Sequence, residues 1–424
     1  MISNWAGNVV FGATQIHRPT SVDELRGIVA AAVRVRALGT GHSFSPVADT
    51  TAELVSLADM PPTIEITADS ASPSVTVAAG VRYGDLAVRL HAAGFALHNL
   101  GSLPHISVAG ACATGTHGSG NKNGNLSTAV SALEMVTGDG SVVCVRRGDE
   151  DFSGYVVALG TLGVVTRMTL DIEPTYEVAQ YVYEAVPAGA LDLDLFAAGY
   201  SVSLFTDWSG PTDPRGPGIN QAWVKRRGTP TLEAWTAPSP WHGATLADRP
   251  MHPIARISPE PATEQLGVPG PWHTRLPHFR LDFTPSVGDE LQTEYFLARE
   301  DGPAAVAAVN ELRDRIAPLI AVTEIRTIAA DDLWLSPAYR RDSLALHFTW
   351  IDDFDAVTAL LPEIEARLAP FGARPHWGKV FTMQPAAVGP LYKKLDDFGR
   401  LRARFDPSGK FGNEFVDMYV PAAG

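Results

Sequence analysis

The sequence predicts an α+β protein of two domains, and three observations support this prediction. The chain has 424 residues, 45% of them hydrophobic, which is more than the core of one ordinary domain requires. Helix and strand patterns alternate over residues 1–176. Residues 209–277 are then rich in Pro and Trp with weak periodicity. We therefore expect a first domain over 1–176, a second over 177–375 and a compact C-terminal segment over 376–424.

The first domain contains the clearest local signals. Ser21 and Glu24 form a capping box before an apolar helical pattern, and a short strand is expected over Val35–Leu38. The segment SVTVAAG predicts a strand, and RYGDLAVRLHAAG predicts a helix that ends at Gly94. ALEMVTGDGSVVCVRRG predicts a hairpin with a tight primed turn at Asp139-Gly140. A helix, a glycine turn and a strand ending near Pro174 follow, and a further helix is expected near 389–404.

Charge and cysteine content restrict the partners and the compartment. The chain has 33 Lys+Arg against 47 Asp+Glu, a net charge of -14 without a basic stripe, which argues against nucleic acid or an anionic membrane as partner. No apolar run approaches the ~18 residues that a membrane span needs, and the N-terminus lacks the features of a signal peptide. Two cysteines, Cys112 and Cys144, form no disulfide framework. We expect a cytoplasmic protein that binds small molecules.

Two clusters of small residues are candidates for a binding site. LGTGHSFSP places His42 in a glycine-rich loop directly after the expected strand. In HNLGSLPHISVAGACATGTHGSG, small residues allow backbone amides to approach a ligand closely, as pyrophosphate recognition requires. Neither cluster contains G-x-G-x-x-G or a Walker motif, and tight packing is the more common explanation of such clusters. The histidines of these segments lack the spacing of a zinc site, so no metal is expected.

Two expected strands carry polar residues at alternate positions. In TEIRTI, Glu324 and Arg326 lie on one face of a strand and Ile325 on the other; in LALHFTW, His347 and Thr349 are related in the same way. A solvated polar face is the ordinary explanation of such a pattern. A carboxylate, a guanidinium, an imidazole and a hydroxyl could alternatively bind several hydroxyls of a polyol.

Four segments, RVRALGTGHSFSP, GSLPHISVAGACATGTHGSG, HWGK and FDPSGKFGNEF, resemble in their order and spacing the vanillyl-alcohol-oxidase-type FAD oxidoreductases, and within them the alditol (xylitol/sorbitol) oxidases. The likeness covers both chain ends and residues 320–350, whereas 209–277 does not align. The resemblance implies the two-domain FAD-binding fold of that family, with a mixed α/β substrate domain. It also implies that 376–424 returns to the FAD and active-site region.

By this resemblance, His42 carries FAD covalently through the 8α-methyl of the isoalloxazine ring; from the residues alone, a loop histidine capping backbone groups is the alternative. No cysteine lies near Gly101-Ser102-Leu103, so a single covalent bond is expected. The other expected FAD contacts lie in the two small-residue clusters, after Gly163 and in HWGK: Leu38, Gly39, Thr40, Gly41, Ser43, Ser102, Ser107, Gly110, Thr114, Gly115, Thr116, His117, Val164 or Val165, and His376.

The resemblance places the substrate against Ser102, Gln292, Glu324, Arg326, His347, Thr349 and Lys379. Alcohol oxidation requires loss of the hydroxyl proton, and a lysine buried beside Arg326 could accept it. Lys379 and Arg326 are therefore the expected catalytic residues, although most lysines are simply solvated. The expected reaction converts an alditol and O2 to an aldose and H2O2 in a monomer.

Two other functions stay open at this stage. One is an aldonolactone-type FAD dehydrogenase with a non-oxygen acceptor, and the other is a flavin-carrying sugar-binding protein without turnover. In the lactone dehydrogenase relatives an alanine excludes oxygen from the flavin, and Gly101 stands at the matching position. Gly101 therefore favours access of oxygen, although a turn glycine would look the same.

Overall fold

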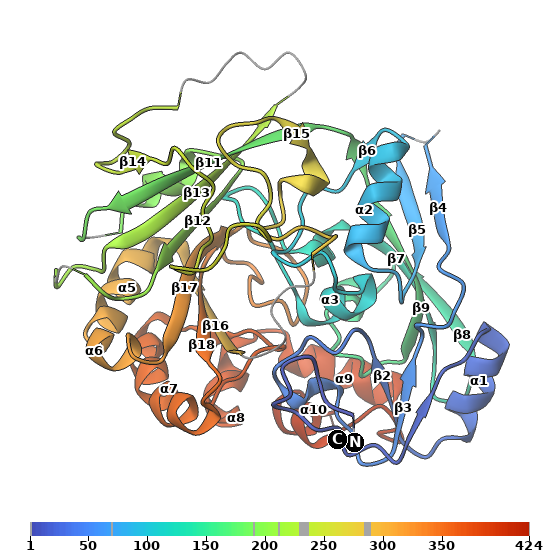
Figure 1. Cartoon of the computed structure of the whole chain (residues 1–424). Helices are drawn as coiled ribbons and strands as arrows, with labels where there is room; N and C mark the ends of the chain where they lie inside the picture. The colour runs from blue at the N-terminus through green and yellow to red at the C-terminus, as the bar shows by residue number, and fades with distance from the viewer. Residues whose placement is uncertain are drawn as a thin grey trace.

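The computed structural model describes residues 2–68, 71–189, 191–210, 213–228, 237–283 and 290–423, and Figure 1 shows the chain from the N-terminus in blue to the C-terminus in red. Its N-terminal part contains two sheets. A parallel sheet has the order β1 (Gln15–His17), β3 (Glu53–Ser56) and β2 (Val35–Leu38). An antiparallel sheet has the order β4 (Ile64–Thr67), β5 (Ser74–Ala78), β9 (Val164–Asp171), β7 (Val130–Val136) and β8 (Val142–Arg146). A short pair, β6 (Phe95–Ala96) with β10 (Glu173–Pro174), completes this part.

Four helices accompany these strands: α1 (Val22–Ala31), α2 (Tyr83–Ala92), α3 (Val108–Thr114) and α4 (Phe152–Val156). The predicted start of α1 is confirmed, because the Ser21 side chain accepts a hydrogen bond from the Glu24 backbone N–H at 3.2 Å. The returning bond of a capping box comes from the neighbour instead, since the Thr20 N–H donates to Glu24 at 2.8 Å. The predicted strand over Val35–Leu38 is also confirmed as β2.

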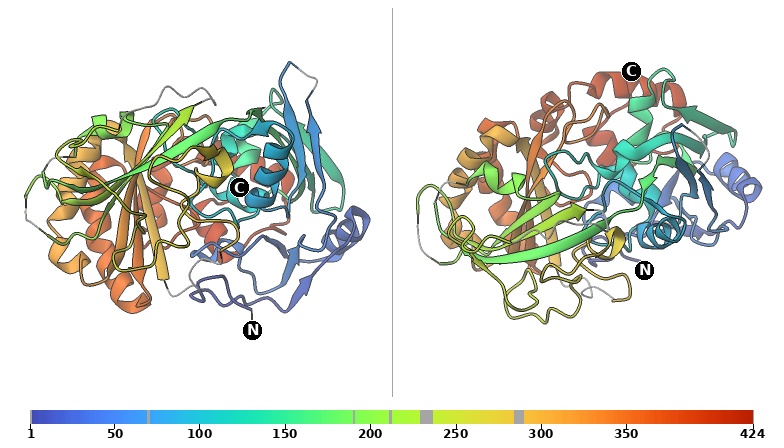
Figure 2. Two further views of the ribbon diagram at one scale, coloured as in Figure 1. Left: turned by 45° about the horizontal axis from the view of Figure 1, so that its top comes forward. Right: turned by 90° about the horizontal axis from the view of Figure 1, so that it is seen from above.

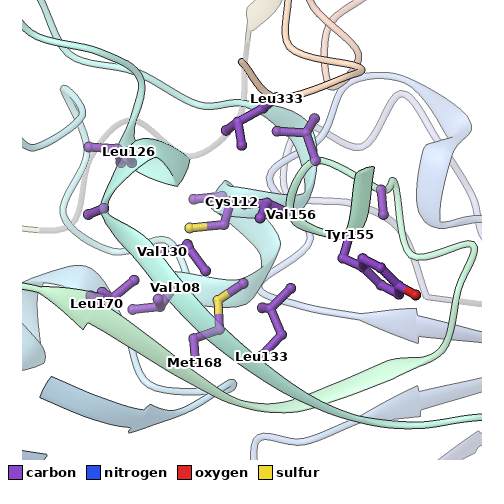
Figure 3. Close-up of a cluster of buried hydrophobic side chains, with 14 of the residues drawn as sticks. Val108, Cys112, Leu126, Val130, Leu133, Tyr155, Val156, Met168, Leu170 and Leu333 are labelled. Atoms are coloured by element: carbon purple, nitrogen blue, oxygen red, sulfur yellow. The ribbon is translucent and has the colours of Figure 1, made fainter. Parts of the chain in front are cut away.

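Helix α3 packs on the core of this N-terminal part, which Figure 3 shows in close-up. Val108 and Cys112 of the helix lie against Val130 and Leu133 of β7 and Met168 of β9. The Cys112 thiol is fully buried in this apolar cluster, and burial raises its pKa to about 11. Cys112 is therefore a packing residue with an unreactive thiol.

A large antiparallel sheet occupies the middle of the chain (Figure 2). Its order is β14 (Thr245–Leu246), β11 (Glu177–Val186), β13 (Ile219–Gly228), β12 (Ser201–Thr206), β17 (Ile320–Ile328), β18 (Ser343–Ile351), β16 (Glu290–Ala298) and β19 (Arg374–Pro375), with β15 (Gly270–Pro271) beside β11. Strands far apart in the chain are neighbours here, so β17 lies between β12 and β18. The boundaries predicted at 176 and 375 stay a prediction.

The two faces of this sheet differ in polarity. Ile325, Leu346 and Phe348 form a core with α5 (Gly302–Asn310) and α7 (Phe354–Leu368), and α6 (Arg313–Ile316) continues this layer. Figures 1 and 2 show these orange helices on the side of the sheet away from the N-terminal part. Since successive strand residues alternate between faces, Glu324 and Arg326 point to the opposite side, toward the N-terminal part.

The C-terminal segment packs back on the N-terminal part through α8 (Pro385–Val388), α9 (Leu395–Phe405) and α10 (Glu414–Tyr419). Arg36, the second residue of β2, is buried and joins the two segments. Its guanidinium donates to the carbonyls of Phe411 at 2.6 Å, Leu159 at 2.7 Å and Gly160 at 3.2 Å, and to that of Val47. A single cation thus satisfies carbonyl groups from three stretches of chain.

The predicted hairpin of β7 with β8 and the C-terminal helix are present, but the turn type of the first and the start of the second are wrong, each for a physical reason. The loop between β7 and β8 is no two-residue primed turn, because the Asp139 side chain accepts from the Ser141 N–H at 3.0 Å and only Gly140 adopts a positive φ, +82°. The helix expected near 389–404 begins at Leu395, since Gly389–Leu391 forms a separate 3₁₀ turn with a proline.

Residues 209–277, whose weak periodicity predicts no helix or strand, contain regular structure. The ten-residue strand β13 lies there, and burial on both faces over most of its length removes the alternation that would have revealed it. Residues 211–212 and 229–236 of this stretch lie outside the described residues.

In the part of the chain that the structure describes, no helix is both long and apolar enough to cross a bilayer.

The hydrogen bonds of the Arg36 guanidinium predict that its removal lowers the stability of the fold. Arg36→Met removes a donor from four carbonyls, of which those of Leu159 and Phe411 are buried and left without it, so we expect the free energy of unfolding in urea to fall by about 3 kcal/mol or more. Arg34→Met is the control, because Arg34 is exposed two residues earlier in the chain. Equal stability of the two variants would contradict the role of Arg36.

Candidate functional site

A cavity of about 810 Å³ lies between the N-terminal part and the polar face of the large sheet. Its N-terminal wall comes from the loop after β2, the segment around α3 and the turn before β9. Its other wall comes from β16, β17, β18 and residues 376–379. The cavity is therefore bounded by the same glycine clusters and polar strands that the sequence singled out.

The structure brings most of the predicted cofactor residues to the cavity wall. Those that line it are Leu38, Gly39, Thr40, Gly41, His42, Ser43, Ser102, Ser107, Gly110, Thr114, Thr116, His117, Val165 and His376. Gly101, the expected position of oxygen access, lines it as well. Two others lie elsewhere. Val164 points into the core beneath α1, and Gly115 ends α3 with its Cα hydrogens toward Pro337 and Val157.

Small residues make a narrow cradle on the N-terminal wall. A Cβ added at Gly39 would lie 2.8 Å from the Ser107 Oγ and 3.7 Å from the Gly110 Cα, so the two glycines face each other closely. The Ser107 Oγ is buried and has no hydrogen-bond partner among the described residues. A ligand with acceptor oxygens would satisfy this hydroxyl. The cradle thus fits a long cofactor that carries a phosphate group.

His42 lies in the loop that follows β2. Its ring stacks on Trp5 with centroids 5.5 Å apart, and its Nδ1 lies 3.1 Å from the Thr40 carbonyl oxygen. Burial lowers the pKa of His42 to about 4, against a smaller opposite effect of the Thr40 carbonyl. The imidazole is therefore neutral near pH 7, with one unprotonated ring nitrogen available as a nucleophile.

The polar wall follows from strand register. Glu294 on β16, His347 on β18 and Glu324 on β17 are paired positions, so the three side chains lie abreast on one face. Gln292 and Thr349 form the adjacent pair. The two-residue spacing predicted from TEIRTI and LALHFTW is confirmed, and this polar face borders the cavity instead of bulk solvent.

Three buried charged side chains, those of Arg326, Glu294 and Glu324, form ion pairs on this wall. Arg326 donates to Glu294 Oε1 at 2.7 Å, and its Nε lies 3.5 Å from Glu324 Oε2. Burial alone raises the pKa of Glu324, but Arg326 and His278 outweigh it and hold that pKa below its usual range. Both carboxylates are thus ionised, and Arg326 stays charged between them.

Two histidines complete the surroundings of Glu294. His117 places Nε2 3.1 Å from Glu294 Oε1 and Nδ1 2.7 Å from the Gly118 carbonyl, so both ring nitrogens face acceptors. His347 Nδ1 lies 3.4 Å from the same carboxylate oxygen. Glu294 thereby links the cofactor wall to the polar strands.

Lys379 lies at the edge of the polar wall beside Phe44 and donates to Gln292 Oε1. Gln292 Nε2 in turn donates to Glu290 at 2.5 Å, which fixes the amide with its oxygen toward the lysine. Burial lowers the pKa of Lys379 to about 8, with Glu294 opposing and Arg326 reinforcing this shift. Near neutral pH a substantial fraction of Lys379 can therefore accept a proton.

Sequence reasoning missed three buried charged or polar residues of this wall: Glu294, Lys225 and His278. The alternation rule would have found Glu294, because it stands two residues after Gln292 on β16. Lys225 and His278 gave no usable signal, since one is in the unrecognised β13 and the other in the Pro- and Trp-rich stretch. His278 Nε2 lies 2.7 Å from Glu324 Oε1.

Over the ranges that the structure describes, no cluster of three or more His, Cys, Asp or Glu side chains could hold a metal ion.

Two family models match the chain. Residues 13–146 match the FAD binding domain and residues 289–419 match the D-arabinono-1,4-lactone oxidase family. The N-terminal part is thus an FAD binding domain, and its match ends within the predicted 1–176. FAD is a long cofactor with a pyrophosphate, as the cradle around Ser107 requires.

Comparison with curated proteins gives full-length relatives. An alditol oxidase from a Streptomyces strain is 47% identical over 420 residues, which cover 98% of each chain. An L-gulono-1,4-lactone dehydrogenase from Mycobacterium tuberculosis is 28% identical and covers 98% of this chain and 97% of its own.

Solved structures show the same architecture. The crystal structure of cholesterol oxidase from B. sterolicum has a TM-score of 0.76 at 15% identity and covers 99% of this chain and 96% of its own. A solvent-stable cholesterol oxidase has a TM-score of 0.79 at 16% identity, with 98% and 96% covered. At such identity the likeness shows the fold alone, and it confirms the predicted two-domain FAD-binding fold.

Proposed function

Because the chain belongs to the alditol oxidase family of FAD-dependent oxidoreductases, we propose that it oxidises the terminal hydroxyl of an alditol such as xylitol or sorbitol to the aldose and reduces O2 to H2O2. The observation that carries this proposal is the polar wall of the buried Glu324, Arg326, His347 and Thr349 with the partly buried Lys379, which faces the FAD-binding wall across one cavity. Such a wall offers donors and acceptors to a ligand with several hydroxyl groups.

His42 is proposed to hold FAD covalently. Its position in the cavity and its neutral ring support this assignment, because only an unprotonated imidazole nitrogen can form the bond to the 8α-methyl. Cys112 cannot provide a second bond, since its thiol is buried in the core shown in Figure 3. The cradle around Ser107, Gly39 and Gly110 is proposed to hold the pyrophosphate.

The bound FAD supplies a two-electron acceptor for the substrate carbon and passes the electrons to O2. Lys379 is proposed to accept the hydroxyl proton, and its lowered pKa makes it a competent base. Arg326 is proposed to stabilise the negative charge that develops on the substrate oxygen, because two carboxylates hold its guanidinium in place. Glu324, Thr349, Gln292, His347 and Ser102 would bind the remaining hydroxyls.

The second candidate is an aldonolactone-type dehydrogenase, which the likeness to the M. tuberculosis relative favours. Gly101 supports the oxidase instead. It lines the cavity, and an added Cβ would lie 3.7 Å from the His117 carbonyl and from Thr116 Cγ2. A methyl group therefore fits there without displacing its neighbours, and the glycine leaves this volume open to oxygen.

The covalent bond is tested by acid precipitation. We expect the flavin to stay with the precipitated native chain and to leave the precipitated His42→Ala chain, because the imidazole is its attachment point. His105→Ala is the control, as His105 lies near His42 and is not part of the cavity wall. Flavin absorbance in the supernatant of the native protein would contradict the bond.

The assigned base is tested by anaerobic single-turnover reduction with xylitol. Lys379→Met should slow flavin reduction by ~10²-fold or more, the usual effect of losing an acid–base group. Native reduction should accelerate as pH rises through about 8, because only neutral Lys379 accepts a proton, and the variant should lose this dependence. Lys393→Met, at an exposed lysine, should reduce at the native rate. Native-like reduction by Lys379→Met would refute the assignment.

Oxygen access is tested by stopped-flow mixing of the xylitol-reduced protein with oxygenated buffer. Gly101→Ala should slow reoxidation much more than reduction, because the methyl group occupies the open volume without disturbing the polar wall. Slow reoxidation of the native protein would favour the dehydrogenase, and identical reoxidation of both proteins would leave Gly101 a turn residue.

A further inference from the structure

Lys225 is a buried cation that no step of the proposed reaction uses. It is 1% exposed and points from β13 toward the polar wall. Its Nζ lies 2.5 Å from the Leu276 carbonyl oxygen, 3.1 Å from the Pro277 carbonyl oxygen and 3.1 Å from His278 Nδ1. Burial lowers the pKa of Lys225 to about 7, and Glu324 opposes this shift. The ammonium form carries three N–H donors for the three surrounding atoms, so this geometry favours the charged form.

These contacts determine which ring nitrogen of His278 carries the proton. The two carbonyl oxygens can only accept, so the third N–H of Lys225 donates to Nδ1, which is then unprotonated. A neutral imidazole with an unprotonated Nδ1 carries its proton on Nε2. This N–H faces Glu324 Oε1 at 2.7 Å and donates to it. Burial lowers the pKa of His278 to about 4, in agreement with a neutral ring.

Aromatic contacts restrict the rotation of the same ring. Trp223 meets it edge to face at 5.2 Å between centroids, and Phe205 does so at 5.6 Å. Trp223 lies on β13 and Phe205 on β12, both buried; β12 pairs with β17, and β13 is the next strand beyond it. The imidazole plane therefore keeps the direction in which Nε2 meets Glu324.

The backbone of His278 also contacts the FAD-binding side. The N–H groups of His278 and Phe279 lie 3.1 and 3.3 Å from the Ser102 carbonyl oxygen. Thr263 Oγ1 donates to the Pro277 carbonyl at 2.7 Å from the other side. His278 is thus fixed relative to Glu324 on one wall and Ser102 on the other.

We propose that Lys225 and His278 are positioning residues that orient Glu324 as a pure acceptor for two neighbouring hydroxyls of the polyol, an inference that rests on the proposed function. His278 donates to Oε1 and the Arg326 guanidinium forms an ion pair with Oε2 at 3.5 Å, so the carboxylate is oriented by one hydrogen bond and kept ionised as an acceptor. The orientation of Glu324 toward a polyol then depends on His278 and Lys225, which no sequence motif identifies.

Two substitutions at His278 separate positioning from packing. His278→Gln places an amide nitrogen where Nε2 lies, so it keeps a donor for Glu324. His278→Asn keeps an acceptor for Lys225 at the place of Nδ1 and leaves Glu324 without the donor. We expect His278→Asn to raise KM for xylitol by about 10-fold or more with a smaller change in kcat, as for loss of a hydrogen bond to a charged group. His278→Gln should stay close to native.

The tautomer of His278 is measured in the native protein without substrate, by two-bond ¹⁵N–¹H correlation spectra of ¹⁵N-histidine-labelled protein, with His278 identified by NOEs from its ring protons to the rings of Trp223 and Phe205. We expect a protonated Nε2 and an unprotonated Nδ1. Protonation on Nδ1 would overturn the inference even if the variants fail to fold. Equal KM values in native and Asn proteins, or equal impairment of both variants, would also overturn it. A native flavin that xylitol does not reduce would contradict the proposed function alone.

Discussion

The site depends on one guanidinium held between two buried carboxylates. Arg326 contacts Glu294 at 2.7 Å and Glu324 at 3.5 Å, and all three side chains are at most 7% exposed. Any one of these charges alone would be costly to bury, and removal of one would leave its partners uncompensated. The set is stable only as a unit, so the strands that carry it must hold a fixed register. Fixed register gives the wall its fixed arrangement of donors and acceptors.

The large sheet holds that register because one of its faces packs into an apolar core and the other forms the polar wall. Ile325, Leu346 and Phe348 are anchored in the core with α5 and α7, so a shift of one residue would place the charged side chains in that apolar core and the apolar side chains on the polar wall. The polar face is then directed at the FAD binding domain, whose small residues leave room for the cofactor. Burial in the closed space between the walls also lowers the pKa of Lys379 to about 8. The packing of the sheet against the FAD binding domain therefore both fixes the charged side chains and lowers the pKa of Lys379.

Much of this arrangement was predictable from local rules. The cap at Ser21, the strand over Val35–Leu38 and the shared face of Glu324 and Arg326 follow from side-chain chemistry and strand periodicity, and all are confirmed. The features that the sequence could not predict depend on burial by segments that are distant in the chain. Strand β13 shows no alternation because most of it is buried on both faces, and Lys225 and His278 become neighbours of Glu324 only through the sheet order. Val164 and Val165 differ only in the face of β9 that they occupy, and the sequence left that choice open.

The central claim is that the polar wall presents an alditol to FAD held on the opposite wall. Anaerobic addition of xylitol to the purified protein, followed by admission of air and a peroxide assay, tests this most directly. The account predicts that xylitol bleaches the visible flavin absorbance, that air restores it, and that one H2O2 forms per flavin reoxidised. A flavin that keeps its absorbance with every polyol from glycerol to sorbitol would contradict the account.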